Sequence, residues 1–157
     1  MEGKRKKIFA AASNGGHWVQ LLRLSRPLEE RFEVVYASTH PKCANMVEGK
    51  DFYLIRDFNR NNAWLIIPAF CQLFRQLWHE KPDTVLTTGA APGLACLLAG
   101  WLLRRKTVWV DSIANVEHLS ASGRIARRFA SRTYTQWSKA ALRGVLFAGT
   151  VLGDKKE

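Results

Sequence analysis

Short apolar runs alternate with longer amphipathic segments along the chain. Residues 8–12 are apolar throughout, which is typical of a strand buried on both faces of a sheet. Similar runs predict further strands at residues 32–37, 52–55, 84–87, 107–110, 132–136 and 145–148. Helical patterns lie at residues 17–24, from 61 or 62 to about 80, at 94–104 and at 123–130. This alternation predicts an α/β fold, a Rossmann-like parallel sheet with helices on both faces.

The length fits a single domain. The chain has 157 residues, which is enough to bury a core but short for an enzyme that must hold two substrates. We therefore predict one domain over residues 1–157, with tails at 1–7 and 153–157. Pro68 falls inside the long helical pattern, so this helix is either kinked or begins later than residue 62.

The chain is strongly basic. It carries 24 Lys and Arg against 13 Asp and Glu, and the net charge of +11 favours phosphate, nucleic acid or anionic lipid as a partner. Cys43, Cys71 and Cys96 lack zinc spacing, are odd in number and lie in or near apolar segments, so we expect buried free thiols in a reducing cytoplasm. The apolar runs at 63–71 and 94–103 are shorter than the roughly 20 residues of a spanning helix. The basic start also lacks the apolar core of a signal peptide.

Polar loops follow three of the predicted strands, at residues 13–17, 88–93 and 111–117. Ligands of open parallel sheets bind outside the carboxyl ends of the strands, so these loops form the candidate site. Gly15 and Gly16 permit a left-handed backbone, and the first amides of the following helix carry about half a positive charge. This arrangement suits a phosphate. Neither the dinucleotide fingerprint nor the P-loop spacing is present, and a purely structural turn is the alternative.

One histidine and two carboxylates are the candidates for proton transfer. The positive end of a helix favours neutral imidazole at His17, which could then accept a proton from a hydroxyl. Alternatively, His17 only caps or lines its loop. Asp111 ends a strand and Glu117 follows in the same loop, so either could orient a hydroxyl or act as a base. The alternative for these carboxylates is a helix cap and a surface charge.

The segment around Trp64 is more apolar than an ordinary amphipathic helix. Residues 64–70 could lie in a lipid headgroup layer, with Arg60 and Arg75 on the lipid phosphates. The alternative is a core helix that covers the sheet.

The three loops together resemble a known family. The motifs are Ala-Ala-Ser-Asn-Gly-Gly-His-Trp-Val-Gln-Leu at 11–21, Thr-Thr-Gly-Ala-Ala-Pro at 87–92 and Trp-Val-Asp-Ser-Ile-Ala-Asn-Val-Glu at 109–117. They resemble the acceptor-side subunit of the split glycosyltransferase that adds the second GlcNAc to dolichol-pyrophosphate-GlcNAc, in its bacterial exopolysaccharide version. That family is similar to the N-terminal half of the peptidoglycan lipid II glycosyltransferase, a GT-B enzyme. The resemblance implies that this chain has the fold of the N-terminal half of a GT-B enzyme.

The resemblance also implies an activity. The chain would be one subunit of a metal-independent, inverting hexosyltransferase that uses no cofactor and is inactive alone. It would bind a polyprenyl-pyrophosphate-linked sugar at an anionic membrane surface, while a separate subunit binds a nucleotide sugar such as a UDP-sugar. No nucleic acid is implied as a partner. The implied location is the cytoplasm or, by peripheral attachment, the cytoplasmic face of the inner membrane.

Three groups of site residues follow from the resemblance and the loop arguments. The catalytic candidates are His17, Glu117 and Asp111. The candidates for binding the acceptor and its pyrophosphate are Ser13, Asn14, Gly15, Gly16, Thr88, Gly89, Ala90, Gly93, Ser112 and Asn115. The candidates for membrane contact are Trp64, Ile67, Phe70 and Arg75.

The chain departs from the family pattern in two places. The eukaryotic subunit begins with a transmembrane anchor, whereas here the basic residues 4–7 lead us to expect peripheral attachment. Asn14 stands where relatives commonly have glycine or a small residue, which bears on the backbone geometry of the first loop.

Two other functions remain open on the sequence alone. The charge and six Trp would suit a basic Rossmann-like protein that binds nucleic acid or nucleotide. The chain could also be a complete small enzyme for a mononucleotide.

Overall fold

Seven parallel strands form one sheet in the structure, a computed structural model that describes residues 3–153 except for the side chain of Arg60. The strands lie in the order β3-β2-β1-β4-β5-β6-β7, and all neighbouring pairs are parallel. They are β1 (Lys7–Ala12), β2 (Glu33–Ser38), β3 (Phe52–Leu54), β4 (Thr84–Thr87), β5 (Lys106–Val110), β6 (Arg132–Thr135) and β7 (Leu146–Phe147).

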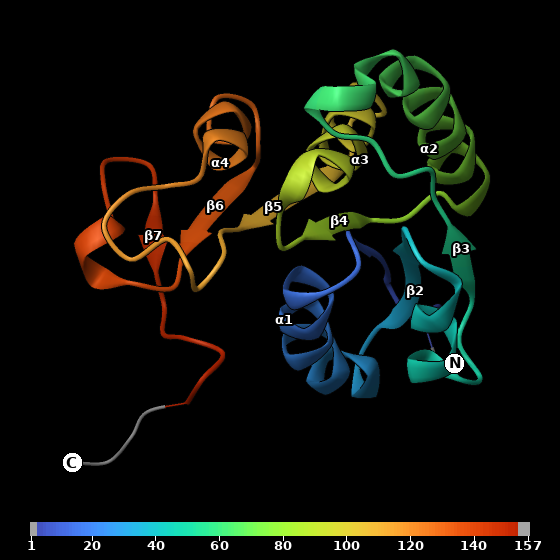
Figure 1. Cartoon of the computed structure of the whole chain (residues 1–157). Helices are drawn as coiled ribbons and strands as arrows, with labels where there is room; N and C mark the ends of the chain where they lie inside the picture. Colours follow the sequence, from blue (N-terminus) through green and yellow to red (C-terminus); the bar gives the residue numbers. More distant parts are fainter. Residues whose placement is uncertain (1–2, 154–157) are drawn as a thin grey trace.

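Helices cover the sheet from both sides, because β1 is apolar on both faces. They are α1 (Gly16–Ser25), α2 (Ile66–Glu80), α3 (Ala90–Leu102) and α4 (Ala121–Ala126), with 3-10 turns at Arg26–Glu30, Pro41–Val47, Arg60–Leu65 and Ser138–Ala140. Ile8, Ala10 and Ala12 belong to the core under α1, whereas Phe9 and Ala11 belong to the core under α2, α3 and α4. Figure 1 shows α1 on one side of the sheet and α2 and α3 on the other. The predicted Rossmann-like α/β fold is confirmed.

The long helix starts at Ile66, which confirms the alternative that it begins later than residue 62. Asn62 is not helical, and Pro68 lies in the first turn of the helix, where a missing backbone N–H costs little. Two other predicted boundaries are wrong by a few residues. Helix α3 starts at Ala90 instead of residue 94, so the second glycine loop is shorter than predicted. The first tail is also shorter than predicted, since Lys7 pairs with Glu33 in the sheet. The tail predictions for residues 1–2 and 154–157 lie outside the described residues.

The order of the strands brings two of the predicted loops together. After β1 the chain builds outward through β2 and β3, then returns to place β4 on the other side of β1. The order in which strands are added to the sheet therefore reverses between β1 and β4, although these strands are parallel. Helix α1 follows β1 and packs on one face of the sheet, whereas α3 follows β4 and packs on the other face. Such a reversal point is where open α/β sheets bind ligands.

None of the helices within residues 3–153 combines the length and apolar character needed to cross a bilayer. All three cysteines are free thiols, and Cys43 and Cys96 are buried as predicted. The prediction is wrong for Cys71, which is exposed because it lies on α2 outside the face formed by Ala69, Leu73 and Leu77.

Candidate functional site

The first glycine loop presents an open helix N-terminus. Gly15 has a φ of 96°, a value that favours glycine, and α1 begins at the next residue without a side-chain cap or an acidic residue in its first turn. A Cβ placed on Gly16 would meet no side chain and no other segment of the chain within 4 Å, so this position faces open space. Asn14 is outside the left-handed region and its amide donates to Thr39 Oγ1 at 3.0 Å. Asn14, where relatives commonly have glycine or a small residue, therefore does not force an unusual backbone conformation on the loop.

The second glycine loop presents another uncapped helix end. Gly89 has a φ of 134°, and Ala90 follows with a φ of 65° at the start of α3. A non-glycine residue held at positive φ costs of order 1 kcal/mol, and such strain clusters at ligand sites. The amide of Gly89 donates to Thr87 Oγ1 at 3.3 Å, so the donors that this end of α3 offers to an anion are the first amides of the helix.

His17 joins the two loops. Its Nδ1 lies 3.0 Å from the carbonyl oxygen of Thr88, and the Thr88 hydroxyl donates to the carbonyl oxygen of His17 at 2.6 Å. The imidazole lies against Gly89, where an added Cβ would come within 2.8 Å of the ring. A carbonyl oxygen only accepts hydrogen bonds, so Nδ1 carries the proton and Nε2 of the neutral ring is left as an acceptor. This is the tautomer that a general base at Nε2 requires.

Asp111 is buried and fully engaged. Its Oδ1 accepts from Trp109 Nε1 at 3.0 Å and from the Ser120 hydroxyl at 2.6 Å, while its Oδ2 accepts from the Ser120 amide at 2.8 Å. Ser120 in turn caps α4 through the amide of Gly123. The carboxylate therefore holds both ends of the loop after β5 instead of facing solvent, and it is poorly placed to take a proton from a substrate.

The rest of that loop divides into a buried start and an exposed tip. Ser112 is buried, and its hydroxyl accepts from Ala114 N at 3.2 Å and from Gln20 Nε2 at 3.3 Å. Asn115 is half-buried, with its amide on the carbonyl oxygen of Ser112. Glu117 is exposed. Of the two candidate carboxylates, only Glu117 is accessible to a ligand.

Several predicted acceptor-binding residues have another role in the structure. The Thr88 hydroxyl is committed to His17, and the backbone of Gly89 packs under the imidazole. Gly93 is buried in α3, where an added Cβ would come within 2.2 Å of Thr87 Oγ1, so this glycine lets the helix approach β4. Half-exposed or exposed positions remain at Ser13, Asn14, Gly15, Gly16, Ala90 and Asn115. These positions form the accessible part of the predicted site.

The predicted membrane segment has one buried and one exposed face. Ala69, Leu73 and Leu77 of α2 are buried against the sheet, as expected of a core helix. Trp64 and Ile67 are both 72% exposed. The Phe70 ring is half-buried and packs on the core and on Phe74, so it offers less contact than predicted. Arg75 is exposed and borders, with Arg56, a shallow pocket beside Pro68.

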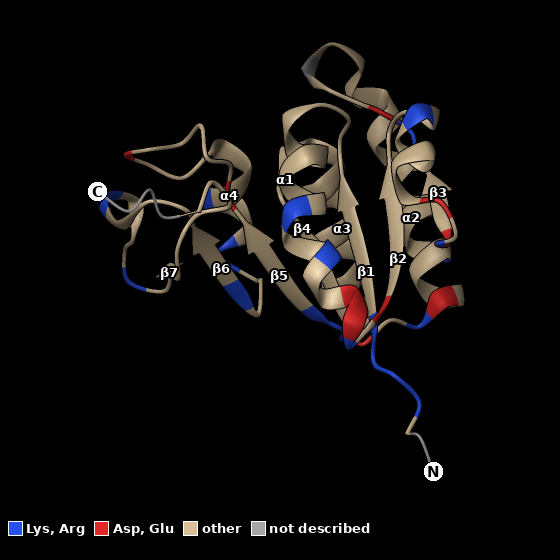
Figure 2. Cartoon of the chain, turned by 90° about the horizontal axis from the view of Figure 1, so that it is seen from below, with Lys and Arg blue, Asp and Glu red and all other residues tan. Residues whose placement is uncertain are grey.

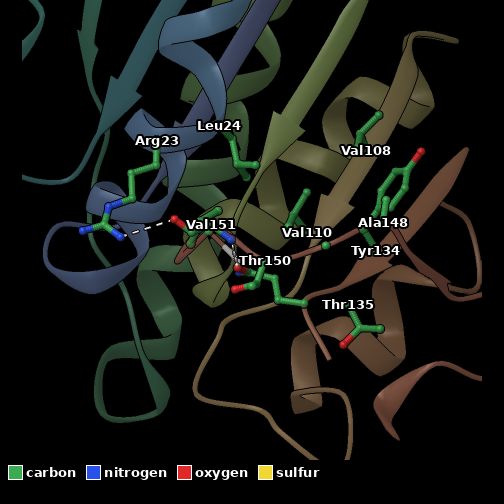
Figure 3. A pocket seen from close by; sticks show the side chains of 12 residues that line it. Arg23, Leu24, Val108, Val110, Tyr134, Thr135, Ala148, Thr150 and Val151 are labelled. Carbon is green, nitrogen blue, oxygen red and sulfur yellow. Dashed lines mark hydrogen bonds between the residues drawn. The ribbon is translucent and has the colours of Figure 1, made fainter. Parts of the chain in front are cut away.

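A separate pocket lies under the sheet on the α1 side. It has a volume of about 720 Å³ and is lined by Arg23 and Leu24 of α1, by Val108, Val110 and Tyr134 of the strands, and by the segment 148–153. Figure 3 shows these side chains around the pocket, with Arg23 bonded to the carbonyl oxygen of Val151. None of the three catalytic candidates lines it. We therefore place the site at the loops and not in this pocket.

Two groups with displaced pKa values, Tyr53 and Lys7, share the Glu80 carboxylate, and Lys7 lies at the edge of the sheet where the parallel strands begin. A hydrogen bond to Glu80, together with burial, raises the pKa of Tyr53 to about 12. The same carboxylate, 2.8 Å from Lys7 Nζ, raises the pKa of Lys7. Figure 2 shows further Lys and Arg at this edge, where Lys106 and Arg132 begin β5 and β6. These ion pairs fasten β1 to the end of α2 and are structural.

Comparison with known proteins identifies relatives. A family model described as "Oligosaccharide biosynthesis protein Alg14 like" matches residues 55–148. The UDP-N-acetylglucosamine transferase subunit alg14 of Schizosaccharomyces pombe is 27% identical over 164 residues, covering 87% of this chain and 78% of that protein. A pyrophosphoryl-undecaprenol N-acetylglucosamine transferase of Prochlorococcus marinus is 29% identical over 115 residues, covering 66% of this chain and 31% of its own length.

A solved structure supports the fold. MurG of Acinetobacter baumannii matches with a TM-score of 0.77 and 17% identity, covering 91% of this chain and 45% of that one. The predicted fold, the N-terminal half of a GT-B enzyme, is confirmed. The chain spans less than half of the MurG chain. The nucleic-acid alternative is not favoured by these matches.

Proposed function

This chain belongs to the Alg14-like family of oligosaccharide biosynthesis proteins, and we propose that it is the acceptor-binding subunit of a two-chain glycosyltransferase. It binds a polyprenyl-pyrophosphate-linked sugar at a membrane surface, in the synthesis of lipid-linked oligosaccharide or exopolysaccharide. A separate subunit binds the nucleotide sugar. The observation that carries the proposal is the meeting of two uncapped helix ends, α1 and α3, at the carboxyl ends of the adjacent strands β1 and β4. Two such ends suit a group with two phosphates.

The residues at this site take distinct roles in the proposed reaction. The acceptor hydroxyl oxygen attacks the anomeric carbon of the nucleotide sugar, its proton passes to His17 Nε2, and the nucleoside diphosphate leaves with the electrons of the broken bond. The exposed Glu117 orients the attacking hydroxyl. Asp111 acts indirectly, because its carboxylate accepts hydrogen bonds from Trp109 and Ser120 and so holds the loop that carries Glu117. The backbone amides at Gly15, Gly16 and Ala90 hold the pyrophosphate.

A partner subunit is supported by the name of one relative and by exposed apolar surface. The fission yeast relative is named as a subunit of a UDP-N-acetylglucosamine transferase, and we carry that subunit character over to this chain. The apolar residues exposed in the last strands and turns are Leu142, Leu146, Phe147 and Leu152. The strand β7 is an edge strand of only two residues. Exposed apolar residues beside a sheet edge are typical of protein interfaces, so we place the partner there.

Reconstitution of the two chains tests the proposal. The partner is isolated by copurification with this chain from the native host, and transfer is followed with a radiolabelled UDP-sugar and a polyprenyl-pyrophosphate sugar. The names of the relatives make UDP-N-acetylglucosamine the first donor to try. We expect transfer only with both chains present. Full transfer by this chain alone would contradict the proposal.

Substitution of Gly16 with alanine is expected to weaken acceptor use while preserving the fold. The added Cβ meets no side chain and no other segment of the chain within 4 Å, and Gly16 does not have positive φ, so stability should change by less than about 1 kcal/mol. The methyl group instead enters the space proposed for the pyrophosphate. We expect an increase in KM for the lipid acceptor of roughly tenfold, the effect of about 1.4 kcal/mol. An unchanged KM would place the pyrophosphate elsewhere.

Replacing Trp64 and Ile67 with serine is expected to release the chain from membranes. Each side chain is 72% exposed, and burial of one such apolar side chain is worth about 1.5–3 kcal/mol. Retention on vesicles of phosphatidylglycerol and phosphatidylcholine should therefore fall more than about tenfold. Trp78→Ser is the matched control, because Trp78 is 64% exposed but lies 11 residues further along α2, about 16 Å from Ile67. An equal loss in the control would reject a specific contact at Trp64.

A further inference from the structure

Two buried glutamines occupy the centre of the site's polar contacts. Gln20 of α1 is 6% exposed, and Gln136, which follows β6, is 2% exposed. A buried amide is costly unless all of its polar atoms find partners. Here the partners come from three different segments of the chain, so the two side chains do more than satisfy each other.

Gln20 holds the start of the loop after β5. Its Oε1 accepts from the amide of Ile113 at 3.1 Å, and its Nε2 donates to the Ser112 hydroxyl at 3.3 Å. The amide orientation is fixed by chemistry, since the backbone N–H of Ile113 can only donate and must face the oxygen. His17 lies three residues earlier on the same face of α1. The helix that carries the proposed base is therefore tied directly to the loop that carries Glu117.

Gln136 completes the connection. Its Nε2 donates to Gln20 Oε1 at 2.8 Å and to the carbonyl oxygen of Asp111 at 2.9 Å. Its Oε1 accepts from the amide of Val151 at 3.1 Å. Both contacts of Nε2 are to atoms that only accept, so this orientation is fixed as well. The glutamine pair thus joins α1, the loop after β5 and the segment beside the proposed partner interface.

We propose that Gln20 and Gln136 are positioning residues for the transfer reaction, which set the distance between His17 and the loop from Asp111 to Glu117. This inference rests on the proposed function. Every polar side-chain atom of the two glutamines already has at least one partner within the protein. Their effect on the reaction is through geometry, and a displacement of about 1 Å between reacting groups can cost a hundredfold in rate.

Gln20 is needed chiefly as a hydrogen-bond acceptor and Gln136 as a donor, so substitution with glutamate should affect the two positions differently. Gln20→Glu keeps an acceptor for Ile113 and Gln136, and the Ser112 hydroxyl can turn to donate to the second oxygen. Gln136→Glu loses the donor that two acceptors need. In the two-chain assay we expect kcat within about threefold of wild type for Gln20→Glu, and a fall of about tenfold to a hundredfold for Gln136→Glu and for Gln20→Leu, with KM little changed.

A control separates positioning from simple loss of stability. Leu77→Ala opens a cavity at the far end of α2 and should lower the unfolding temperature as much as the glutamine substitutions do. It should nevertheless leave kcat unchanged at temperatures well below unfolding. If Gln136→Glu and Gln20→Leu lower kcat no more than Leu77→Ala does, the inference is wrong. The same holds if Gln20→Glu is as impaired as Gln20→Leu.

A second measurement does not depend on transfer activity. Hydrogen exchange of the isolated full chain should accelerate over residues 111–119 and at Val151 in Gln136→Glu, but remain near wild type there in Leu77→Ala. Unchanged exchange in those segments would overturn the proposed network. Absence of transfer by the wild-type pair, with the exchange pattern as expected, would instead reject the proposed function while retaining the network.

Discussion

Replacing His17 with asparagine is expected to abolish most of the transfer activity, by about a hundredfold to ten-thousandfold, while leaving the loops joined. The asparagine amide can still donate a hydrogen bond to the Thr88 carbonyl oxygen, as Nδ1 does at 3.0 Å in the native chain. Asparagine has no basic nitrogen, so only the proton acceptor at Nε2 is lost. The rate is measured with saturating donor and acceptor in the two-chain assay.

His17→Ala is the companion variant, because it removes both the base and the bridge. If His17 serves only to connect the two glycine loops, asparagine should be nearly as active as histidine and alanine should be impaired. If it is the base, both variants should be impaired to a similar degree. Near-normal turnover by His17→Asn would contradict the assignment.

Replacing Gly93 with alanine is expected to destabilise the chain by about 1–3 kcal/mol, the cost of overpacking a core. The added Cβ would lie 2.2 Å from Thr87 Oγ1 and 3.4 Å from Thr87 Cβ, and both residues are buried where α3 packs on β4. The helix must then shift away from the strand. The free energy of unfolding in urea measures the loss.

A second substitution at Thr87 tests whether the clash is the cause. Thr87→Ala removes Oγ1, so the double variant Gly93→Ala and Thr87→Ala should be less destabilised than the sum of the two single variants. Gly16→Ala provides a glycine control in open space. Additive losses in the double variant would show that the Cβ does not meet Thr87 as the structure has it.

The α/β architecture could be predicted from the sequence because the strands are recognisable as short apolar runs. Residues such as Ile8 to Ala12 are apolar without alternation, which only a sheet covered on both faces explains. The helix boundaries were less accessible, because the start of α3 depends on an unusual backbone at Ala90 that no propensity favours. The start of α2 depends on a turn capped by Asn59 in the preceding segment.

The proximity of the loops after β1 and β4 could be predicted from the sequence, but the directions of their side chains could not. A glycine shortly after a strand indicates a loop, and in sequence Gly15 and Gly93 both fit that description. In the structure Gly15 faces open space, whereas Gly93 packs against Thr87 inside the core. Asp111 comes directly after β5, and its partner Ser120 lies nine residues away. Gln20 and Gln136 were missed because their contact spans 116 residues. A polar residue inside the apolar run of α1 was the one available signal for Gln20.

Binding by the isolated chain tests the central claim most directly. The full chain is titrated with a short-chain polyprenyl-pyrophosphate-GlcNAc and, separately, with UDP-N-acetylglucosamine, by calorimetry at fixed salt. We expect saturable binding of the lipid-linked sugar that inorganic pyrophosphate competes away and that Gly16→Ala weakens, and no measurable binding of the UDP-sugar. Tight binding of the UDP-sugar without binding of the lipid-linked sugar would show that this chain is not the acceptor half.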